Sequence, residues 1–191
     1  MDEKIRCTWS GSDPIYVDYH DQDWGVPARG NRKQFEFLVL ESAQAGLSWL
    51  TILKRRSGYH RLYAGFDAEQ VALFDETRIR TMLQDTGIIR NRLKIESSIN
   101  NAKRFLEISE KHGSFSNYLW GFVDGNQVVN HFKTQSEMPA NTPLSDTISK
   151  DLKQKGFKFL GSTIIYSHLQ ATGMVNDHLV SCFRHKECIE G

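Results

Sequence analysis

The stretch FEFLVLESAQAGLSWLTILKRR, residues 35–56, is the segment around which the chain is organised. Its apolar beginning, FEFLVL, predicts a helix with faces wide enough for a core position. One carboxylate, Glu41, follows this run, and the aromatic Trp49 and the basic residues 54–56 come after a break at Gly46. This order suits a pocket for a flat, charged ligand, although periodicity alone is also consistent with Glu41 as a solvated residue on a polar helix face.

The composition indicates a folded globular protein. A chain of 191 residues, with 39% hydrophobic and 11% aromatic residues, is long enough to bury a core as one domain with at most a small extra lobe. No apolar run approaches the length of a membrane span, and the first residues do not resemble a signal peptide, so we expect a cytoplasmic protein. The three cysteines fit metal ligands or free thiols better than a disulfide framework.

Capping residues and apolar spacing predict a mostly helical chain, and we therefore predict an all-α fold. Residues 1–30 are expected to form a loop with short turns, and residues 123–143 an irregular connection with a short extended piece at 127–132. We find no convincing strand pairing. The expected helices cover about residues 32–45, 49–63 after the N-cap Ser48, 68–74 after Asp67, the segment from Asp75 to Leu83, 89–108, 116–122, 144–155, 162–172, and a last short helix that carries His178 and Cys182.

A possible metal site is divided between the two ends of the chain. His178 and Cys182 are four residues apart, so on a helix both side chains would lie on one face and could bind one ion. The N-terminal loop offers a second pair, Cys7 and His20. A closed set of four ligands would be structural, because it leaves no open position for a catalytic water. The alternative is that these are ordinary surface and core residues.

A predicted helix–turn–helix joint, QDTGIIR at residues 84–90, is typical of an anion site. Gly87 supplies the tight turn, and free backbone N–H groups are expected from Ile88 onward, where the second helix begins. Residues 87–104 hold five basic side chains against one acid, whereas the net charge of the chain is only +1. Such a site binds phosphate without reading base sequence. A plain helical hairpin with a solvated basic face is the alternative. The first basic residues of the joint are Arg90, Arg92 and Lys94.

Aromatic rings are concentrated between residues 9 and 49, close in sequence to Glu41. A protein that acts on one base of a duplex must extrude that base and hold it between planar groups, with polar groups contacting its edge. Glu41 could supply an acceptor for such a base. For each ring taken alone, core packing is the alternative. The rings that could supply planar faces are Trp9, Tyr19, Trp24 and Trp49.

Several blocks resemble the 3-methyladenine DNA glycosylase I family of bacteria. They are CTWSGSDPIYVDYHDQDWGVP, LESAQAGLSWLTILKRR, DTGIIRNRLKI and GFKFLGSTIIYSHLQATGMVNDH, followed by the terminal HxxxC. The resemblance extends in order from Cys7 to Cys182. It implies an all-α member of the helix-hairpin-helix DNA glycosylase superfamily, and a structural zinc ion that joins the N- and C-terminal segments. The implied zinc ligands are Cys7, His20, His178 and Cys182.

The resemblance also implies a single unit, residues 1–191, with a helical core at about 32–173 and a zinc-binding lobe from 1–30 and 174–191. It implies a monofunctional repair enzyme that flips out N3-methyladenine and hydrolyses its glycosidic bond, leaving an abasic site without a lyase step. Methylation at N3 makes the base a cation and weakens this bond, which explains why no aspartate follows the hairpin as it does in many relatives. No lysine suits a lyase step, because Lys94 is expected on the outer basic face.

The resemblance also implies a role for each of the candidate site residues. Glu41 would accept hydrogen bonds from the base and favour its cationic, flipped state. Tyr19 and Trp49 would orient and stack the base, with Trp9 nearby. The hairpin would hold the phosphates of double-stranded DNA through Gly87, Ile88, Arg90 and Arg92.

The sequence is also consistent with two other functions. One is a glycosylase with a broader range of alkylated purines, and another is a helix-hairpin-helix DNA-binding module with structural zinc and no catalytic activity. Cys188 could compete with Cys182 as a ligand, although the helical spacing favours Cys182. We expect a bacterial cytoplasmic protein, a monomer, with no membrane partner.

Overall fold

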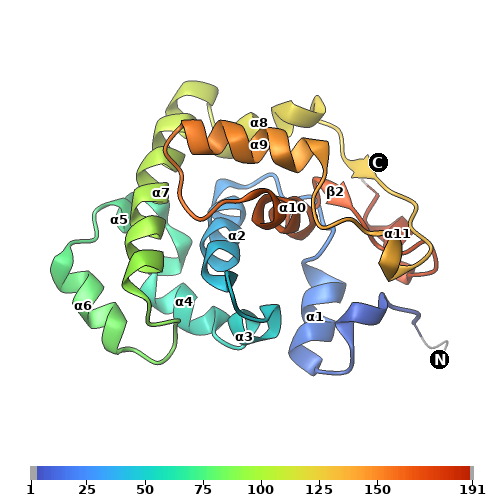
Figure 1. Ribbon diagram of the computed structural model, residues 1–191, viewed down its shortest axis with the longest axis horizontal. Helices are drawn as coiled ribbons and strands as arrows, with labels where there is room; N and C mark the ends of the chain where they lie inside the picture. The colour runs from blue at the N-terminus through green and yellow to red at the C-terminus, as the bar shows by residue number, and fades with distance from the viewer. Residues whose placement is uncertain (1–3, 190–191) are drawn as a thin grey trace.

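The computed structural model describes residues 4–189 and is mostly helical, with one short pair of strands, which confirms the predicted all-α fold class (Figure 1). None of the helices in this range is long and apolar enough to cross a membrane. The α-helices are α1 Pro14–Gln22, α2 Asn31–Gln44, α3 Trp49–Leu53, α4 Arg56–Leu62, α5 Ala68–Ala72, α6 Glu76–Gln84, α7 Arg92–His112, α8 Phe115–Trp120, α9 Pro143–Gln154, α10 Ser162–Ala171 and α11 Phe183–Glu187. Short 3-10 helices cover Thr8–Ser10, Ala64–Phe66, Gly121–Val123 and Gln135–Glu137.

Helix α2 lies at the centre of the molecule, between α7 on one side and α10 on the other (Figure 1). Its large apolar residues Phe35, Phe37, Leu38 and Leu40 are each at most 1% exposed. Burying a side chain of this size contributes about 1.5–3 kcal/mol, so the central helix is held by packing rather than by its own propensity. The same packing also encloses Glu41 at the end of the apolar run.

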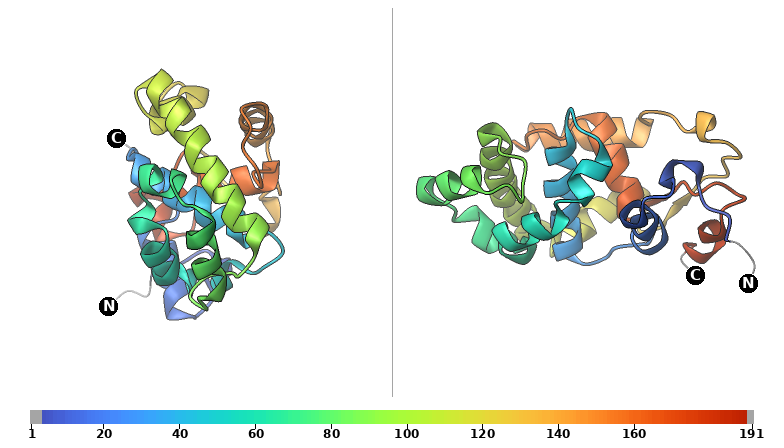
Figure 2. Two further views of the ribbon diagram at one scale, coloured as in Figure 1. Left: turned by 90° about the vertical axis from the view of Figure 1, so that its left-hand side faces the viewer. Right: turned by 90° about the horizontal axis from the view of Figure 1, so that it is seen from below.

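The two ends of the described chain lie side by side at one end of the molecule, as the right-hand view of Figure 2 shows. The backbone N–H of Phe183 donates to the carbonyl of Ile5 at 2.9 Å. Strand β1, Val128–Val129, pairs in parallel with β2, Val175–Asn176, and Val180 donates to Phe132. These contacts place α1 and the C-terminal loop together beside the central helix.

The N-terminal 30 residues are not the loop that we predicted, because α1 occupies nine of them. Asp13 accepts a hydrogen bond from the backbone N–H of Ile15, and Pro14 occupies the first turn of the helix. An N-cap aspartate followed by proline is a helix start signal. In the predicted loop, the same Asp-Pro pair would instead form one of the short turns.

Two helix boundaries also differ from the prediction. Ser48 caps a helix as expected, but this helix ends at Leu53, and α4 begins anew at Arg56 because Arg55 leaves the helical conformation (φ −109°, ψ 3°). The long helix starts at Arg92 rather than at about Ile89, with Asn91 as its N-cap. The short β1–β2 pair is a strand pairing that the sequence did not reveal.

His178 and Cys182 do not lie on a helix, so the prediction of a last helix carrying both was wrong. They lie in the loop that joins β2 to α11, and Cys182 is the N-cap residue of α11. The N–H of Cys182 donates to the carbonyl of Leu179, which closes a tight turn between the two residues. The turn brings their side chains together, as the four-residue spacing on a helix would have done.

Candidate active site and metal cluster

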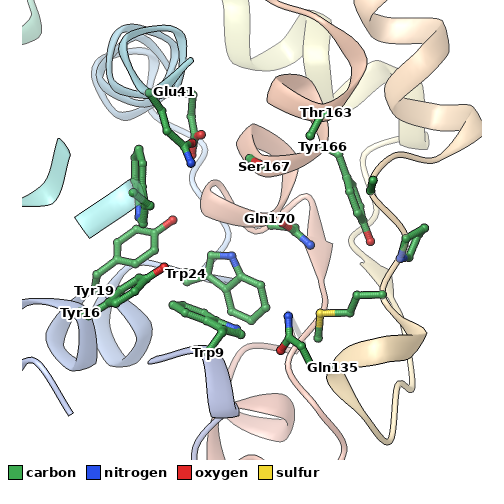
Figure 3. Close-up of a pocket in the computed structure, with 15 residues that line it drawn as sticks. Trp9, Tyr16, Tyr19, Trp24, Glu41, Gln135, Thr163, Tyr166, Ser167 and Gln170 are labelled. Carbon is green, nitrogen blue, oxygen red and sulfur yellow. The ribbon is translucent and has the colours of Figure 1, made fainter. Parts of the chain in front are cut away.

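A cavity of about 330 Å³ opens beside α2, and its walls come from five parts of the chain (Figure 3). Aromatic rings from the N-terminal segment and α3 form one side, Glu41 and Gln44 come from α2, and α10 forms the opposite side. Residues of the segment 135–140 complete the lining. The lining residues are Trp9, Tyr16, Tyr19, Trp24, Glu41, Gln44, Trp49, Gln135, Met138, Pro139, Ala140, Thr163, Tyr166, Ser167 and Gln170.

The aromatic side of the cavity is a connected set of rings. The centroid of Trp9 lies 5.2 Å from that of Tyr16 and 4.8 Å from that of Trp24. Tyr19 and Trp49 meet edge to face at 5.3 Å. These contacts hold the rings in fixed orientations, so the cavity offers rigid flat surfaces for a planar ligand. Burial raises the pKa of Tyr19 well above its ordinary value, and its hydroxyl therefore remains protonated.

Three residues that line this cavity each carry a buried polar atom without a hydrogen-bond partner in the described range. These atoms are Oε2 of Glu41 and the indole nitrogens Nε1 of Trp9 and Trp49, half of the six such side-chain atoms found in residues 4–189. A buried polar group without a hydrogen bond costs about 1–3 kcal/mol. Since Trp N–H groups donate and a carboxylate oxygen accepts, a ligand with both acceptors and donors would satisfy all three.

Glu41 is 2% exposed, and its burial raises its pKa from 4.5 to about 8. No cation offsets this burial, because desolvation is the only cause of the shift. A carboxyl group in such a place is characteristic of a functional site rather than of a solvated helix face. The solvated alternative for Glu41 is therefore wrong.

The prediction that Lys94 lies on the outer basic face is wrong. Lys94 is partly buried, and its Nζ donates to the carbonyl oxygens of Ala43 at 2.8 Å and Ala45 at 2.7 Å. These carbonyls belong to the C-terminal end of α2, where a cation interacts favourably with the helix dipole. Burial lowers the pKa of Lys94. The lysine thus connects the start of α7 to the helix that carries Glu41.

The structure also adds cavity residues that sequence reasoning did not identify. Tyr16 lies one turn before Tyr19, a relation that becomes visible only once α1 is recognised as a helix. The α10 side was missed entirely, although its polar residues recur with helical spacing in an apolar helix. That spacing was the available signal, and the residues are Thr163, Tyr166, Ser167 and Gln170.

The four predicted metal ligands meet in one buried cluster, with all their ligand atoms within 4.8 Å of one another. Sγ of Cys182 lies 3.5 Å from both Nε2 of His20 and Nδ1 of His178, and Sγ of Cys7 lies 3.6 Å from Nδ1 of His178. The hydrogen bond with Cys7, ahead of those from the imidazoles, lowers the pKa of Cys182, and the same contact raises that of Cys7. Two thiols and two imidazoles in this arrangement could hold one metal ion.

The second nitrogen of each imidazole is already oriented by the protein. Nδ1 of His20 lies 2.7 Å from Oδ1 of Asp21, and Nε2 of His178 lies 2.9 Å from the carbonyl oxygen of Trp24. Such partners select the tautomer that leaves the other nitrogen free to bind a metal. Gly25 (φ +79°) is required here, because a Cβ at this position would lie 2.8 Å from the His178 ring.

The predicted phosphate site is the turn between α6 and α7. The N–H of Gly87 donates to Asp85 and that of Ile89 to Tyr59, whereas those of Ile88 and Arg90 have no protein acceptor within residues 4–189. The side chain of Ile88 is buried, so only its backbone can contact a ligand. The turn packs closely on α4, since a Cβ on Gly58 would lie 2.1 Å from the carbonyl oxygen of Gly87.

The predicted basic residues of the hairpin differ in their availability. Arg90 is exposed and makes no ion pair within the described range. Arg92 is paired with Glu76 at 2.9 Å and with Glu96 at 3.1 Å. Of the two arginines, Arg90 is therefore better placed to contact an anion.

The chain matches the family model for methyladenine glycosylases over residues 9–185. It is 46% identical to DNA-3-methyladenine glycosylase 1 of Escherichia coli (strain K12), over 93% of this chain and 95% of that protein. A crystal structure of 3-methyladenine DNA glycosylase I superposes with a TM-score of 0.91 at 45% identity, covering 94% of this chain and 98% of the other. A tyrosine-to-phenylalanine variant of 3-methyladenine DNA glycosylase I, in complex with 3-methyladenine, superposes with a TM-score of 0.90 at 37% identity, covering 93% and 96%. The chain therefore belongs to the methyladenine glycosylase family.

Proposed function

We propose that this protein is a DNA glycosylase that excises 3-methyladenine from alkylated DNA during repair. The observation that carries the proposal is the unpartnered Oε2 of Glu41, buried in an aromatic cavity with two unpartnered indole N–H groups. Adenine offers ring nitrogens as acceptors and an exocyclic amino group as a donor, which complements this set. Relatives that cover nearly the whole chain are named as 3-methyladenine glycosylases, and one was solved with that base.

The chemistry requires the enzyme to bind the base rather than to protonate it. N3-methyladenine is a cation in DNA, so its glycosidic bond is weakened and the base leaves as a neutral molecule. Glu41 accepts hydrogen bonds from the extruded base and stabilises its positive charge, while Tyr19, Trp49 and Trp9 orient and stack it. Water then completes hydrolysis and leaves an abasic site. The amine of Lys94 is held by two carbonyls, which fits an enzyme without a Schiff-base lyase step.

In this proposal the α6–α7 hairpin is a helix-hairpin-helix element that holds a phosphate of double-stranded DNA. The free N–H groups of Ile88 and Arg90, the turn at Gly87 and the side chain of Arg90 support this role, with Arg92 as a weaker contributor because of its ion pairs.

The Cys7, His20, His178 and Cys182 cluster is proposed to hold one structural zinc ion. Two sulfur and two nitrogen ligands are the donor set that zinc prefers, and the set is closed to a catalytic water. The ion would join the segments 1–30 and 174–191 to the helical core, about 32–173, in one monomeric unit; residues 1–3 and 190–191 of that unit lie outside the described range. Metal analysis tests this: Cys182→Ser should lose the ion, and Cys188→Ser, which removes a buried thiol outside the cluster, should retain it.

The decisive experiment is incubation with methylated double-stranded DNA, followed by chromatography of the released bases. Release of 3-methyladenine alone supports the proposal, and release of 7-methylpurines at comparable rates would instead indicate a broader alkylpurine glycosylase. Glu41→Gln should lose most of the excision but retain DNA binding, whereas Glu110→Gln, an exposed acid on α7, should behave as wild type. Unchanged release of 3-methyladenine by Glu41→Gln would contradict the role of Glu41.

A further inference from the structure

Asp177 is a buried carboxylate directly behind the α10 side of the cavity, and none of the roles above uses it. It is 0% exposed and accepts three hydrogen bonds from neutral groups. Oδ2 accepts from Oη of Tyr166 at 2.5 Å and from Nε2 of Gln170 at 2.7 Å, and Oδ1 accepts from Nδ2 of Asn130 at 2.7 Å. Within residues 4–189, no lysine or arginine forms an ion pair with Asp177, so neutral donors alone satisfy it.

Two of these donors, Tyr166 and Gln170, also line the cavity. Figure 3 shows them on the side away from Tyr16 and Tyr19, with the hydroxyl of Tyr166 and the amide nitrogen of Gln170 turned toward the same place. Asp177 thus orients the polar ends of two side chains that line the cavity.

Asp177 is the acceptor in each of its three side-chain hydrogen bonds and donates none of them. Gln170 must therefore direct its NH₂ group at Asp177, which leaves its Oε1 as an acceptor with no protein partner in the described part of the chain. Tyr166 likewise donates its single O–H to Asp177, so its oxygen can only accept a hydrogen bond from any further group. Tyr166 and Gln170 could each donate or accept a hydrogen bond. Because both donate to Asp177, each can act only as an acceptor toward the cavity.

We propose that Asp177 is a positioning residue that makes this wall an acceptor surface, and that the surface selects a base with an exocyclic amino group over one with a carbonyl. The inference rests on the proposed glycosylase function and concerns its specificity. An adenine amino group can donate to the wall, whereas the guanine O6 carbonyl would oppose another acceptor and leave both unpaired. Sites built to hydrogen-bond a donor discriminate strongly against analogues that lack it.

The test measures the release of 3-methyladenine and of 3-methylguanine from the same methylated DNA, under single-turnover conditions with excess enzyme. Asp177→Asn has nearly the same shape but can donate, so Gln170 is free to turn its NH₂ group toward the cavity. We expect the ratio of the 3-methyladenine rate to the 3-methylguanine rate to fall by about fivefold to tenfold, the effect of one hydrogen bond. Gln170→Met, which removes the acceptor itself, should lower the ratio similarly.

The double variant Asp177→Asn with Gln170→Met should lower the ratio no further than Gln170→Met alone, because Asp177 acts through Gln170. The matched control is the pair Tyr118 and Asp151, a hydrogen-bonded tyrosine and carboxylate that do not line the cavity. Tyr118→Phe and Asp151→Asn should leave the ratio at its wild-type value. Metal content and thermal melting of each variant confirm that the fold is retained.

Equal loss of both rates in Asp177→Asn, with an unchanged ratio, would show a merely structural role and overturn the inference. If Asp177→Asn does not fold, Gln170→Met decides instead, and an unchanged ratio in that variant overturns the inference equally. A wild-type protein that releases no 3-methyladenine would refute the proposed function itself, which is a separate and distinguishable result.

Discussion

Glu41→Gln should make the protein more stable at alkaline pH while removing its activity. Burial raises the pKa of Glu41 to about 8 in the folded protein, against 4.5 in an exposed environment. Between these values the folded protein holds a proton that the unfolded chain releases. The free energy of unfolding therefore decreases as pH rises through this window and levels off above about 8. Glutamine is neutral at every pH, so the variant lacks this contribution.

The structure sets the size of the effect. One unit of pKa shift corresponds to about 1.36 kcal/mol, so the wild type should lose about 4 kcal/mol between pH 5 and pH 8 through Glu41 alone. For a protein of 150–250 residues, 1 kcal/mol changes Tm by about 2–4 °C. The Tm of Glu41→Gln should therefore equal that of the wild type near pH 5 and exceed it by about 10 °C at pH 8.

Calorimetric melts of both proteins at pH 5.0, 6.5 and 8.0 provide the measurement, and the difference between them cancels the titration of every shared group. Glu110→Gln, an exposed acid on α7, controls for the loss of one carboxylate and should show no such widening. A difference in Tm that stays constant with pH, or a Glu41→Gln variant that is less stable at pH 8, would refute the assignment of Glu41 as a desolvated acid without a partner.

Three further outcomes are expected. The kcat/KM for excision should rise with pH and level off above about 8, because ionised Glu41 binds a cationic base better; a flat profile from pH 6 to 9 would contradict this. Gly58→Ala should displace the hairpin, cost about 1–3 kcal/mol in stability and weaken DNA binding, whereas Gly30→Ala, with open space around it, should do neither in melting and binding assays. Lys94→Met should lower the Tm by the loss of two charged hydrogen bonds, each worth about 1.5–3 kcal/mol, and the exposed Lys103→Met should not; equal melts would show that Lys94 does not hold the end of α2.

Much of the fold follows from local sequence signals. The apolar run before Glu41 predicted the central helix, and the caps Ser48, Asp67 and Asp75 marked true helix starts. The failures were also local in origin. The Asp13-Pro14 pair can begin either a turn or a helix, and the packing of this segment against α3 decides between them.

The candidate site was predictable in part from residue type and spacing. Glu41, Trp49 and the aromatic N-terminal segment were found, and Cys7, His20, His178 and Cys182 do converge as expected. The polar residues of α10 recur with helical spacing, but their placement beside Glu41 depends on tertiary packing, and so does their support by Asp177. The position of Lys94 is another such case. Its place in a basic stretch does not indicate that its amine binds carbonyl oxygens some fifty residues away in the sequence.

The attachment of Lys94 to the end of α2 has a consequence for the DNA. The lysine lies in the first turn of α7, directly after the hairpin turn, and it holds the helix that carries Glu41. In the proposed complex, the folded protein therefore fixes the distance between the phosphate bound at the hairpin and the cavity that receives the base. The duplex must deform until one nucleotide meets that distance, so sequences that bend and unstack easily around a lesion should be repaired fastest.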